Sequence, residues 1–245
     1  MAGDVHPDLE SARQVFRRAQ QHLAEFKVQI GGDNLWRITD SGDSADGTWI
    51  YRLELNRAQL TSIKPIIADC ANNLVNTLDH VAAAIARANG HARDPNLYFP
   101  FGTTEEKYAV SMAKYGRRLG RNMVQLLTEI HAEHRHEVPH LAATKEISRT
   151  TKHWELMPST ASAHAVTWQV PGCGQRWAQI PADTFSSSDS FDFHRGAERL
   201  PLGFSIMIQL TLNGLSSPIQ SPDTILDCAS RYVEGVIAAV SAAKG

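Results

Sequence analysis

Five polar side chains are spaced along residues 65 to 89 so that a helix would carry all of them on one side. They are Asp69, Asn73, Asn76, His80 and Arg87. Amides and an imidazole can hydrogen-bond a ligand, and an imidazole can also move protons near neutral pH. The chain therefore offers a candidate site for binding or acid–base chemistry, and the plain alternative is a solvated helix face.

The same segment carries the strongest helical pattern in the chain. Its apolar positions recur every three or four residues up to Gly90, which is typical of a half-buried helix. These positions are Ile67, Cys70, Leu74, Leu78, Val81 and Ile85. Asparagine is a poor helix former because its side chain competes with the backbone, so the cluster Asn72, Asn73 and Asn76 needs a compensating contact. An interior cleft or a dimer seam would supply that contact.

A first helix and a hairpin are predicted before this segment. Proline and acids followed by apolar residues at helical spacing predict a helix over residues 7 to 29. Residues 34 to 55 alternate apolar and polar positions around a loop rich in turn formers, as a β-hairpin does. The hairpin side chains expected to pack toward the helices are Trp36, Ile38, Tyr51, Leu53 and Leu55.

The rest of the chain predicts further helices and then strands. Helices are expected at residues 104 to 115, 120 to 133 and 139 to 156, and strands at 163 to 170, 176 to 180 and 203 to 212. A final helix is expected from Ser221 onward. We therefore expect one mainly α-helical α+β domain over residues 1 to 245. Its parts would be a helical portion over 1 to 157 with the hairpin at 34 to 55, and a small β portion with the C-terminal helix over 158 to 245.

Composition excludes several classes of protein. The formal net charge of −2 gives no overall attraction to nucleic acid or to an anionic membrane, so any RNA binding must be local. No apolar run approaches the roughly 20 residues of a membrane span, and no secretory signal is seen, so a cytoplasmic protein without membrane contact is expected. The three cysteines form no CxxC pair, and the P-loop, dinucleotide and nucleophile-elbow motifs are missing, so no cofactor is expected.

Several segments in order resemble one family. ADCANNLVNTLDHVAAAI at residues 68 to 85 is similar to the helix of a group of uncharacterised bacterial proteins related to the HEPN superfamily (higher eukaryotes and prokaryotes nucleotide-binding). RLEL before this helix, LYFPFG at 97 to 102 and EISRTTKHWEL at 146 to 156 are similar to further segments of the same group. The resemblance covers roughly residues 9 to 156 and implies a HEPN-like helical bundle.

HEPN ribonucleases use a histidine for proton transfer and an arginine for charge on the phosphate, usually in a dimer. By this resemblance His80, Asp79 and Asn76 are the candidate catalytic residues, and Asn73 and Asp69 are candidate binding residues. The arginine position is occupied by Val75, whose side chain can neither carry charge nor donate a hydrogen bond. The resemblance therefore implies a domain that binds a nucleotide or RNA, with a homodimer as the assembly, and that is a divergent ribonuclease if it is an enzyme.

Cations near the end of the predicted 139 to 156 helix could replace the lost arginine. Arg149, Lys152 and His153 lie there, and the helix dipole alone would explain a cationic helix end. The sharper hypothesis is that one of them meets the polar stripe and creates a phosphate or carboxylate pocket, so all three are candidate binding residues.

Two alternatives remain open from the sequence. The first is an interaction or structural protein whose polar stripe is a dimer seam or a surface. The second is a metal-dependent hydrolase built on the histidines from His131 to His140. That cluster lacks the HExxH spacing, and the sequence does not place an acidic third ligand, so no metal site is expected.

Overall fold

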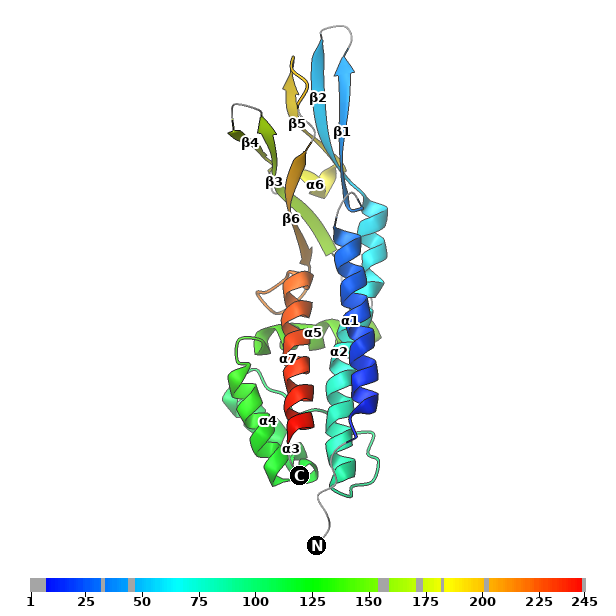
Figure 1. Ribbon diagram of the computed structural model, residues 1–245, viewed down its shortest axis with the longest axis vertical. Coiled ribbons are helices and arrows are strands. Elements are labelled where there is room, and N and C mark those ends of the chain that lie inside the picture. The colour runs from blue at the N-terminus through cyan, green and yellow to red at the C-terminus, as the bar shows by residue number, and fades with distance from the viewer. Residues whose placement is uncertain are drawn as a thin grey trace. The chain divides into compact units, whose positions relative to one another are not determined.

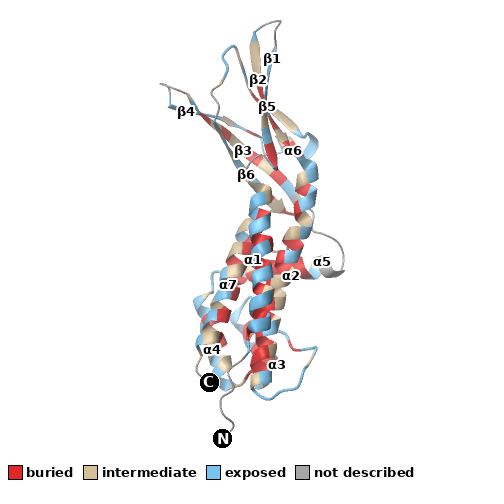
Figure 2. Cartoon of the chain, turned by 45° about the vertical axis from the view of Figure 1, so that its right-hand side comes forward, coloured by how far each residue is buried: buried red, intermediate tan, exposed pale blue. Residues whose placement is uncertain are grey.

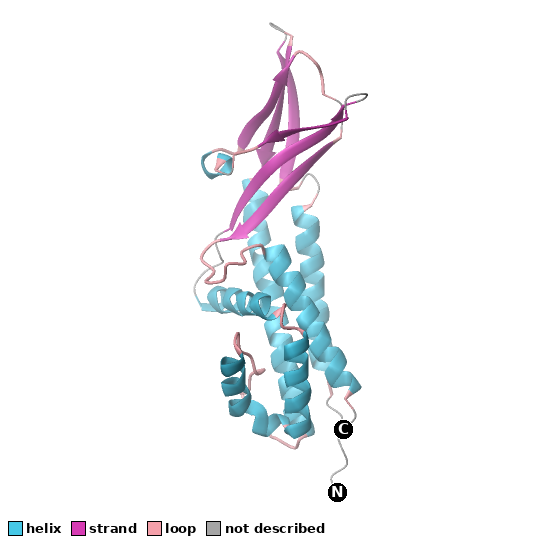
Figure 3. Cartoon of the chain, turned by 90° about the vertical axis from the view of Figure 1, so that its left-hand side faces the viewer, coloured by secondary structure: helices cyan, strands magenta, loops and turns pink. Residues whose placement is uncertain are grey.

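The computed structural model describes residues 8–31, 34–43, 47–153, 159–170, 174–181, 183–200 and 203–243, without the side chains of Asp43, Lys152, His153 and Ser159. These residues form seven helices and six strands, which confirms the mainly helical α+β class (Figure 1, Figure 3). The helices are α1 (Glu10–Ile30), α2 (Arg57–Ala88), α3 (Glu105–Leu119), α4 (Arg121–Glu133), α5 (Val138–His153), α6 (Thr184–Ser187) and α7 (Pro222–Ala242). The strands are β1 (Trp36–Asp43), β2 (Thr48–Leu55), β3 (Ser159–Val170), β4 (Gly174–Gln179), β5 (Ser190–Gly196) and β6 (Phe204–Leu212).

The chain divides into two compact units, each assembled from separate stretches. The helical unit comprises Met1–Glu25, Pro65–Met157 and Gly214–Gly245, and the sheet unit comprises Phe26–Lys64 and Pro158–Asn213. The sequence-based division near residue 157 placed the final helix with the late strands. The structure instead groups α7 with the helices, because α7 packs against α4 and α5.

The helical unit is built around the apolar faces of α2 and α7, which are coloured as buried along their length in Figure 2. The α2 positions picked out by the sequence pattern are all at most 2% exposed. On α7 the buried positions repeat with the same helical spacing, at Ile225, Ala229, Val233, Val236 and Val240. Burial of such side chains stabilises each by about 1.5–3 kcal/mol relative to exposure, so these two stripes hold the unit together. No helix among the described residues carries an apolar stretch that could cross a bilayer.

Helix α2 begins eight residues before the predicted start at Pro65. The side chain of Asn56 accepts a hydrogen bond from the backbone N–H of Gln59 at 3.0 Å, which caps the first turn. Proline inside a helix is costly because it lacks an N–H and crowds the preceding turn. Leu60 and Ile63 are buried in the added turns, and their burial offsets that cost.

The sheet unit contains two antiparallel three-stranded sheets, ordered β1-β2-β5 and β4-β3-β6. The predicted hairpin is confirmed, with Trp36 opposite Leu55 at its open end. Strand β5 was not predicted, because its Ser- and Asp-rich surroundings have the composition of a loop. It pairs with β2, and Arg52 donates to Asp192 at 2.6 Å across the two strands.

Aromatic rings fill the core of the sheet unit. The Tyr51 ring lies 6.2 Å from Phe193 on β5 and 5.8 Å from Phe204 on β6, and Trp168 on β3 lies 6.0 Å from Phe193. The prediction that Tyr51 faces the helices was therefore wrong. A hairpin has two faces, and here strands that follow much later in the chain cover the apolar one.

Candidate functional site

A polar cleft of about 620 Å³ lies between α2 and α5 in the helical unit. Its lining comes from four separate segments of the chain. Helix α2 contributes Val75 and Asp79, helix α5 contributes Ala142, Lys145, Glu146, Ser148 and Arg149, and Tyr98 and Ser216 come from the loops after α2 and before α7. A volume of this size is typical of small-molecule sites.

The α2 wall of the cleft is fixed by two hydrogen bonds. Ser148 donates its hydroxyl to Asn72 Oδ1 at 2.7 Å, which joins α5 to α2. The backbone N–H of Phe99 donates to Asp79 Oδ1 at 2.9 Å, which joins the loop after α2 to the same helix. Asn72 thus has the compensating contact that an asparagine inside a helix requires.

Lys145 is a partly buried cation in this cleft. Its Nζ lies 4.8 Å from the centroid of the Phe101 ring, within the range of a cation–π contact. Burial lowers the pKa of Lys145, while the negative charge of Asp79 acts in the opposite direction. Asp79 and Lys145 therefore share one electrostatic environment, in which the carboxylate favours the charged ammonium.

Glu146 and Arg149, two further charged groups that line the cleft, differ in their hydrogen-bond partners among the described residues. Glu146 accepts from the Ser216 N–H at 2.9 Å and from its hydroxyl at 2.7 Å, so both carboxylate oxygens are used. Arg149 is exposed, lies one turn beyond Lys145, and has no ion-pair or hydrogen-bond partner among the residues described. The guanidinium is therefore available to an anion that enters the cleft.

The structure brings together only part of the predicted site. Asp79 and Arg149 line the cleft beside Val75, as the sharper sequence hypothesis required for Arg149. The other predicted residues of α2 do not line it: Asp69 and His80 are exposed, and Asn73 and Asn76 are partly buried. His80 Nδ1 lies 2.8 Å from the Ser11 hydroxyl on α1. Consecutive helical residues point about 100° apart, so Asp79 can line the cleft while His80 faces α1.

Lys152 and His153 occupy the last residues of α5. Their side chains lie outside the described part of the structure, so the prediction that they bind a ligand stays a prediction.

The histidines between residues 131 and 140 are engaged in separate contacts. His131 Nδ1 lies 3.2 Å from the Tyr232 hydroxyl, His134 Nδ1 lies 3.8 Å from a Glu137 oxygen, and His140 Nδ1 lies 3.1 Å from the His136 carbonyl oxygen. Within the described ranges no three histidine, cysteine or carboxylate side chains are grouped as metal ligands. The metal-hydrolase alternative therefore gains no support from this cluster.

Sequence reasoning missed Lys145, Tyr98 and Ser216. Lys145 stands four residues before Arg149, and this spacing is visible in the segment KEISR. Two cations one turn apart on a largely buried helix would have been the usable signal. Ser216 had no such signal, because it lies 70 residues from the Glu146 that binds it.

Comparisons of this chain with models of protein families, with curated proteins and with solved structures find no match.

Proposed function

We propose that the α2–α5 cleft binds a phosphate group of a nucleotide or of an RNA strand, as part of a HEPN-like domain. Lys145 and Arg149 would bind the phosphate oxygens, and Asp79 would hold Lys145 in its charged form. Arginine can donate two parallel hydrogen bonds to phosphate, and hydrogen bonds with a charged partner are about twice as strong as neutral ones.

One observation carries this proposal: three segments that resemble the HEPN-related group meet at one cleft. The α2 segment provides Val75 and Asp79. The LYFPFG loop is tied to Asp79 through the Phe99 N–H, and the EISR segment is tied to Asn72 through Ser148.

Val75 provides the second support. In HEPN ribonucleases an arginine at this position stabilises charge on the phosphate, and here Val75 lines the same cleft as Lys145 and Arg149. The positive charge that Val75 does not supply is therefore present in the same cleft on α5.

The proposal is for binding and does not include cleavage of RNA. Cutting at the ribose 2′-hydroxyl needs a group that accepts its proton, which an imidazole supplies in HEPN ribonucleases. The described lining of the cleft contains no histidine, and His80 bonds to Ser11 on another side of α2. The proposed role is that of a phosphate-binding domain.

Fluorescence anisotropy of a labelled single-stranded oligoribonucleotide, with adenosine monophosphate and inorganic phosphate as competitors, tests this proposal. Arg149→Gln should weaken binding about tenfold or more, because a hydrogen bond to a charged group contributes about 1.5–3 kcal/mol. Lys145→Gln should act in the same direction. Arg87→Gln is the matched control, since Arg87 is exposed on α2 and does not line the cleft.

Two results would overturn the proposal. The first is an unaltered protein that binds neither the oligonucleotide nor the competitors. The second is equal loss of binding in Arg149→Gln and Arg87→Gln, which would indicate general attraction between charges. A loss confined to His80→Gln would move the site from the cleft to the side of α2 on which His80 contacts Ser11.

A further inference from the structure

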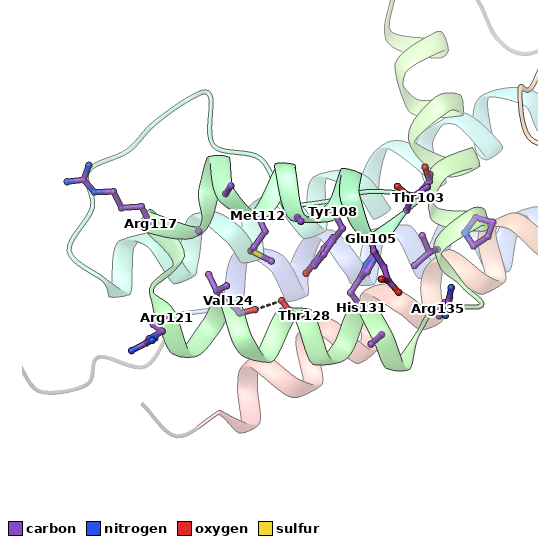
Figure 4. Close-up of a pocket in the computed structure, with 17 residues that line it drawn as sticks. Thr103, Glu105, Tyr108, Met112, Arg117, Arg121, Val124, Thr128, His131 and Arg135 are labelled. Carbon is purple, nitrogen blue, oxygen red and sulfur yellow. Dashed lines mark hydrogen bonds between the residues drawn. The ribbon is translucent and has the colours of Figure 1, made fainter.

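A second and larger concavity runs between α3 and α4 (Figure 4), and its lining also includes Val138 and Pro139 at the start of α5. The two helices are joined at Gly120, whose φ of 80° lies in the left-handed region that glycine tolerates. The groove between them has a volume of about 930 Å³, which is near the upper end for ligand pockets. Helix α3 has 15 residues and is therefore about 22 Å long, so the groove offers room for an extended ligand.

The floor of the groove is apolar, and its polar groups are already paired. Met112 and Val124 face each other across it in Figure 4. The Tyr108 hydroxyl donates to the Leu127 carbonyl at 2.9 Å, and the Thr128 hydroxyl donates to the Val124 carbonyl at 2.7 Å. A ligand that offers no hydrogen bonds can therefore cover this floor without leaving these groups unsatisfied.

The histidine in the floor is uncharged near neutral pH. The His131 ring stacks on Tyr108 with centroids 3.8 Å apart, and its edge meets Tyr232. Burial lowers the pKa of His131 below its usual value of 6.5. The floor thus presents a neutral aromatic surface to the groove.

The ends of the groove carry cations. Arg117 and Arg121 lie where α3 passes into α4, and Arg135 lies at the other end with Glu105 (Figure 4). None of the three arginines has an ion-pair or hydrogen-bond partner in the described part of the chain. In Figure 4 the side chains of Arg117 and Arg121 point outward from this end of the groove and away from each other, and both are long enough to turn toward a head group bound there. Two arginines without a described partner at one end of an apolar trough complement a ligand with an anionic head and an apolar body.

We propose that the α3–α4 groove binds a single-chain amphiphile, with its alkyl chain along the Tyr108, Met112 and Val124 floor and its anionic head at Arg117 and Arg121. Transfer of the ligand's alkyl chain from water to the apolar floor is favourable. The anionic head of the ligand forms charge-assisted hydrogen bonds at one defined end of the groove. The charges fix the orientation of the ligand, because that end carries two arginines and no carboxylate among its described lining residues.

Equilibrium dialysis of labelled hexadecanoate against the full-length protein, below the concentration at which hexadecanoate forms micelles, tests the proposal. Hexadecanol and acetate are the comparison ligands, since one lacks the charge and the other lacks the chain. Hexadecanoate should bind in a ratio of one to one and at least tenfold more tightly than hexadecanol, with no detectable binding of acetate.

Two pairs of variants test the binding of the ligand's alkyl chain and of its anionic head separately. Ala113→Trp fills the groove from an exposed position, whereas Val110→Trp adds the same ring at a site on α3 that is 72% exposed and outside the groove. The first should abolish binding and the second should leave it unchanged. Arg117→Gln with Arg121→Gln should remove the preference for hexadecanoate over hexadecanol, whereas Lys107→Gln, also on α3, should not.

Failure of the unaltered protein to bind hexadecanoate would overturn the proposal. Equal binding of hexadecanoate and hexadecanol would overturn the role of the arginines, and an unchanged affinity in Ala113→Trp would overturn the location. Each of these results is independent of phosphate binding at the α2–α5 cleft, whose lining residues stay unaltered in all four variants.

Discussion

The two concavities of the helical unit differ in how their charges are arranged. In the α2–α5 cleft, Asp79, Lys145, Glu146 and Arg149 lie within one polar lining, and the charge of Asp79 acts on Lys145. In the α3–α4 groove the floor is neutral and its polar groups are paired, while the unpaired cations lie at the ends. A small polar anion therefore suits the cleft, and a long molecule with one charged end suits the groove.

This difference shows why the size of a pocket does not indicate its ligand. The groove is the larger of the two, at about 930 Å³ against about 620 Å³ for the cleft. The ligand is decided by which groups remain unsatisfied, because a buried polar group without a partner costs about 1–3 kcal/mol. The following variants break or sharpen the comparison, from the largest expected effect to the smallest.

Asp79→Ala should be the most damaging change to the polar cleft. It leaves the Phe99 N–H without its acceptor and Lys145 without the carboxylate that favours its charge. We expect a loss of about 2 kcal/mol in the free energy of unfolding, measured by urea denaturation. Asp69→Ala on the exposed part of α2 is the control and should stay within about 0.5 kcal/mol of the unaltered protein. Equal effects of the two variants would show that Asp79 does not organise the cleft.

Tyr108→Phe should destabilise the groove by less. The change removes the hydrogen bond to the Leu127 carbonyl and keeps the ring that stacks on His131. We expect a loss of about 1 kcal/mol in the same urea measurement, since that is typical of one neutral hydrogen bond. Tyr98→Phe, at a tyrosine that is 49% exposed, should change the free energy of unfolding little. An unchanged free energy of unfolding in Tyr108→Phe would contradict a stabilising hydrogen bond between the Tyr108 hydroxyl and the Leu127 carbonyl.

The titration of His131 should make the groove sensitive to mild acid. Because burial lowers the pKa of His131 in the folded protein, the unfolded chain takes up this proton more readily. The stability contributed by the neutral ring is therefore complete above pH 6.5 and is lost as the pH falls below it. His131→Gln should reduce the decline in the free energy of unfolding over that range. An identical pH dependence in both proteins would contradict the neutral floor.

Lys145 should make the cleft sensitive at the alkaline end instead. Burial lowers its pKa in the folded protein, so the cost of burying the ammonium is complete at lower pH and fades as the pH rises toward 10.5. The free energy of unfolding of the unaltered protein should rise relative to that of Lys145→Met as the pH approaches that value. A difference in the free energy of unfolding that stays constant with pH would contradict a lowered pKa of Lys145 in the folded protein.

Ser11→Ala should have the smallest effect. It removes the exposed hydrogen bond to His80, and we expect a change within about 0.5 kcal/mol in the free energy of unfolding and none in ligand binding. Loss of RNA binding in this variant would return the site to the His80 side of α2.

The sequence was a good guide wherever a pattern repeats along one element. The helical spacing from Ile67 to Ile85 predicted the buried face of α2, and alternation around a turn predicted the β1–β2 hairpin. The apolar pattern also predicted the end of α2 near Gly90. The start of α2 was not predicted, because it depends on the Asn56 cap, a single local hydrogen bond. Strand β5 escaped prediction because pairing with β2, far away in sequence, overrides a loop-like composition.

The candidate site shows the limit of such patterns. A helical repeat assigned Asp69, Asn73, Asn76 and His80 to one face, and that assignment treats the helix as isolated. Which face meets another element depends on packing between segments far apart in the chain, such as Ser148 on Asn72 and Ser216 on Glu146. The sequence by itself thus determined the helix and the types of polar groups on it. Only the tertiary structure decided that Asp79 lines one cleft with Lys145 and that His80 contacts Ser11, because residues about 100° apart on a helix face different neighbours.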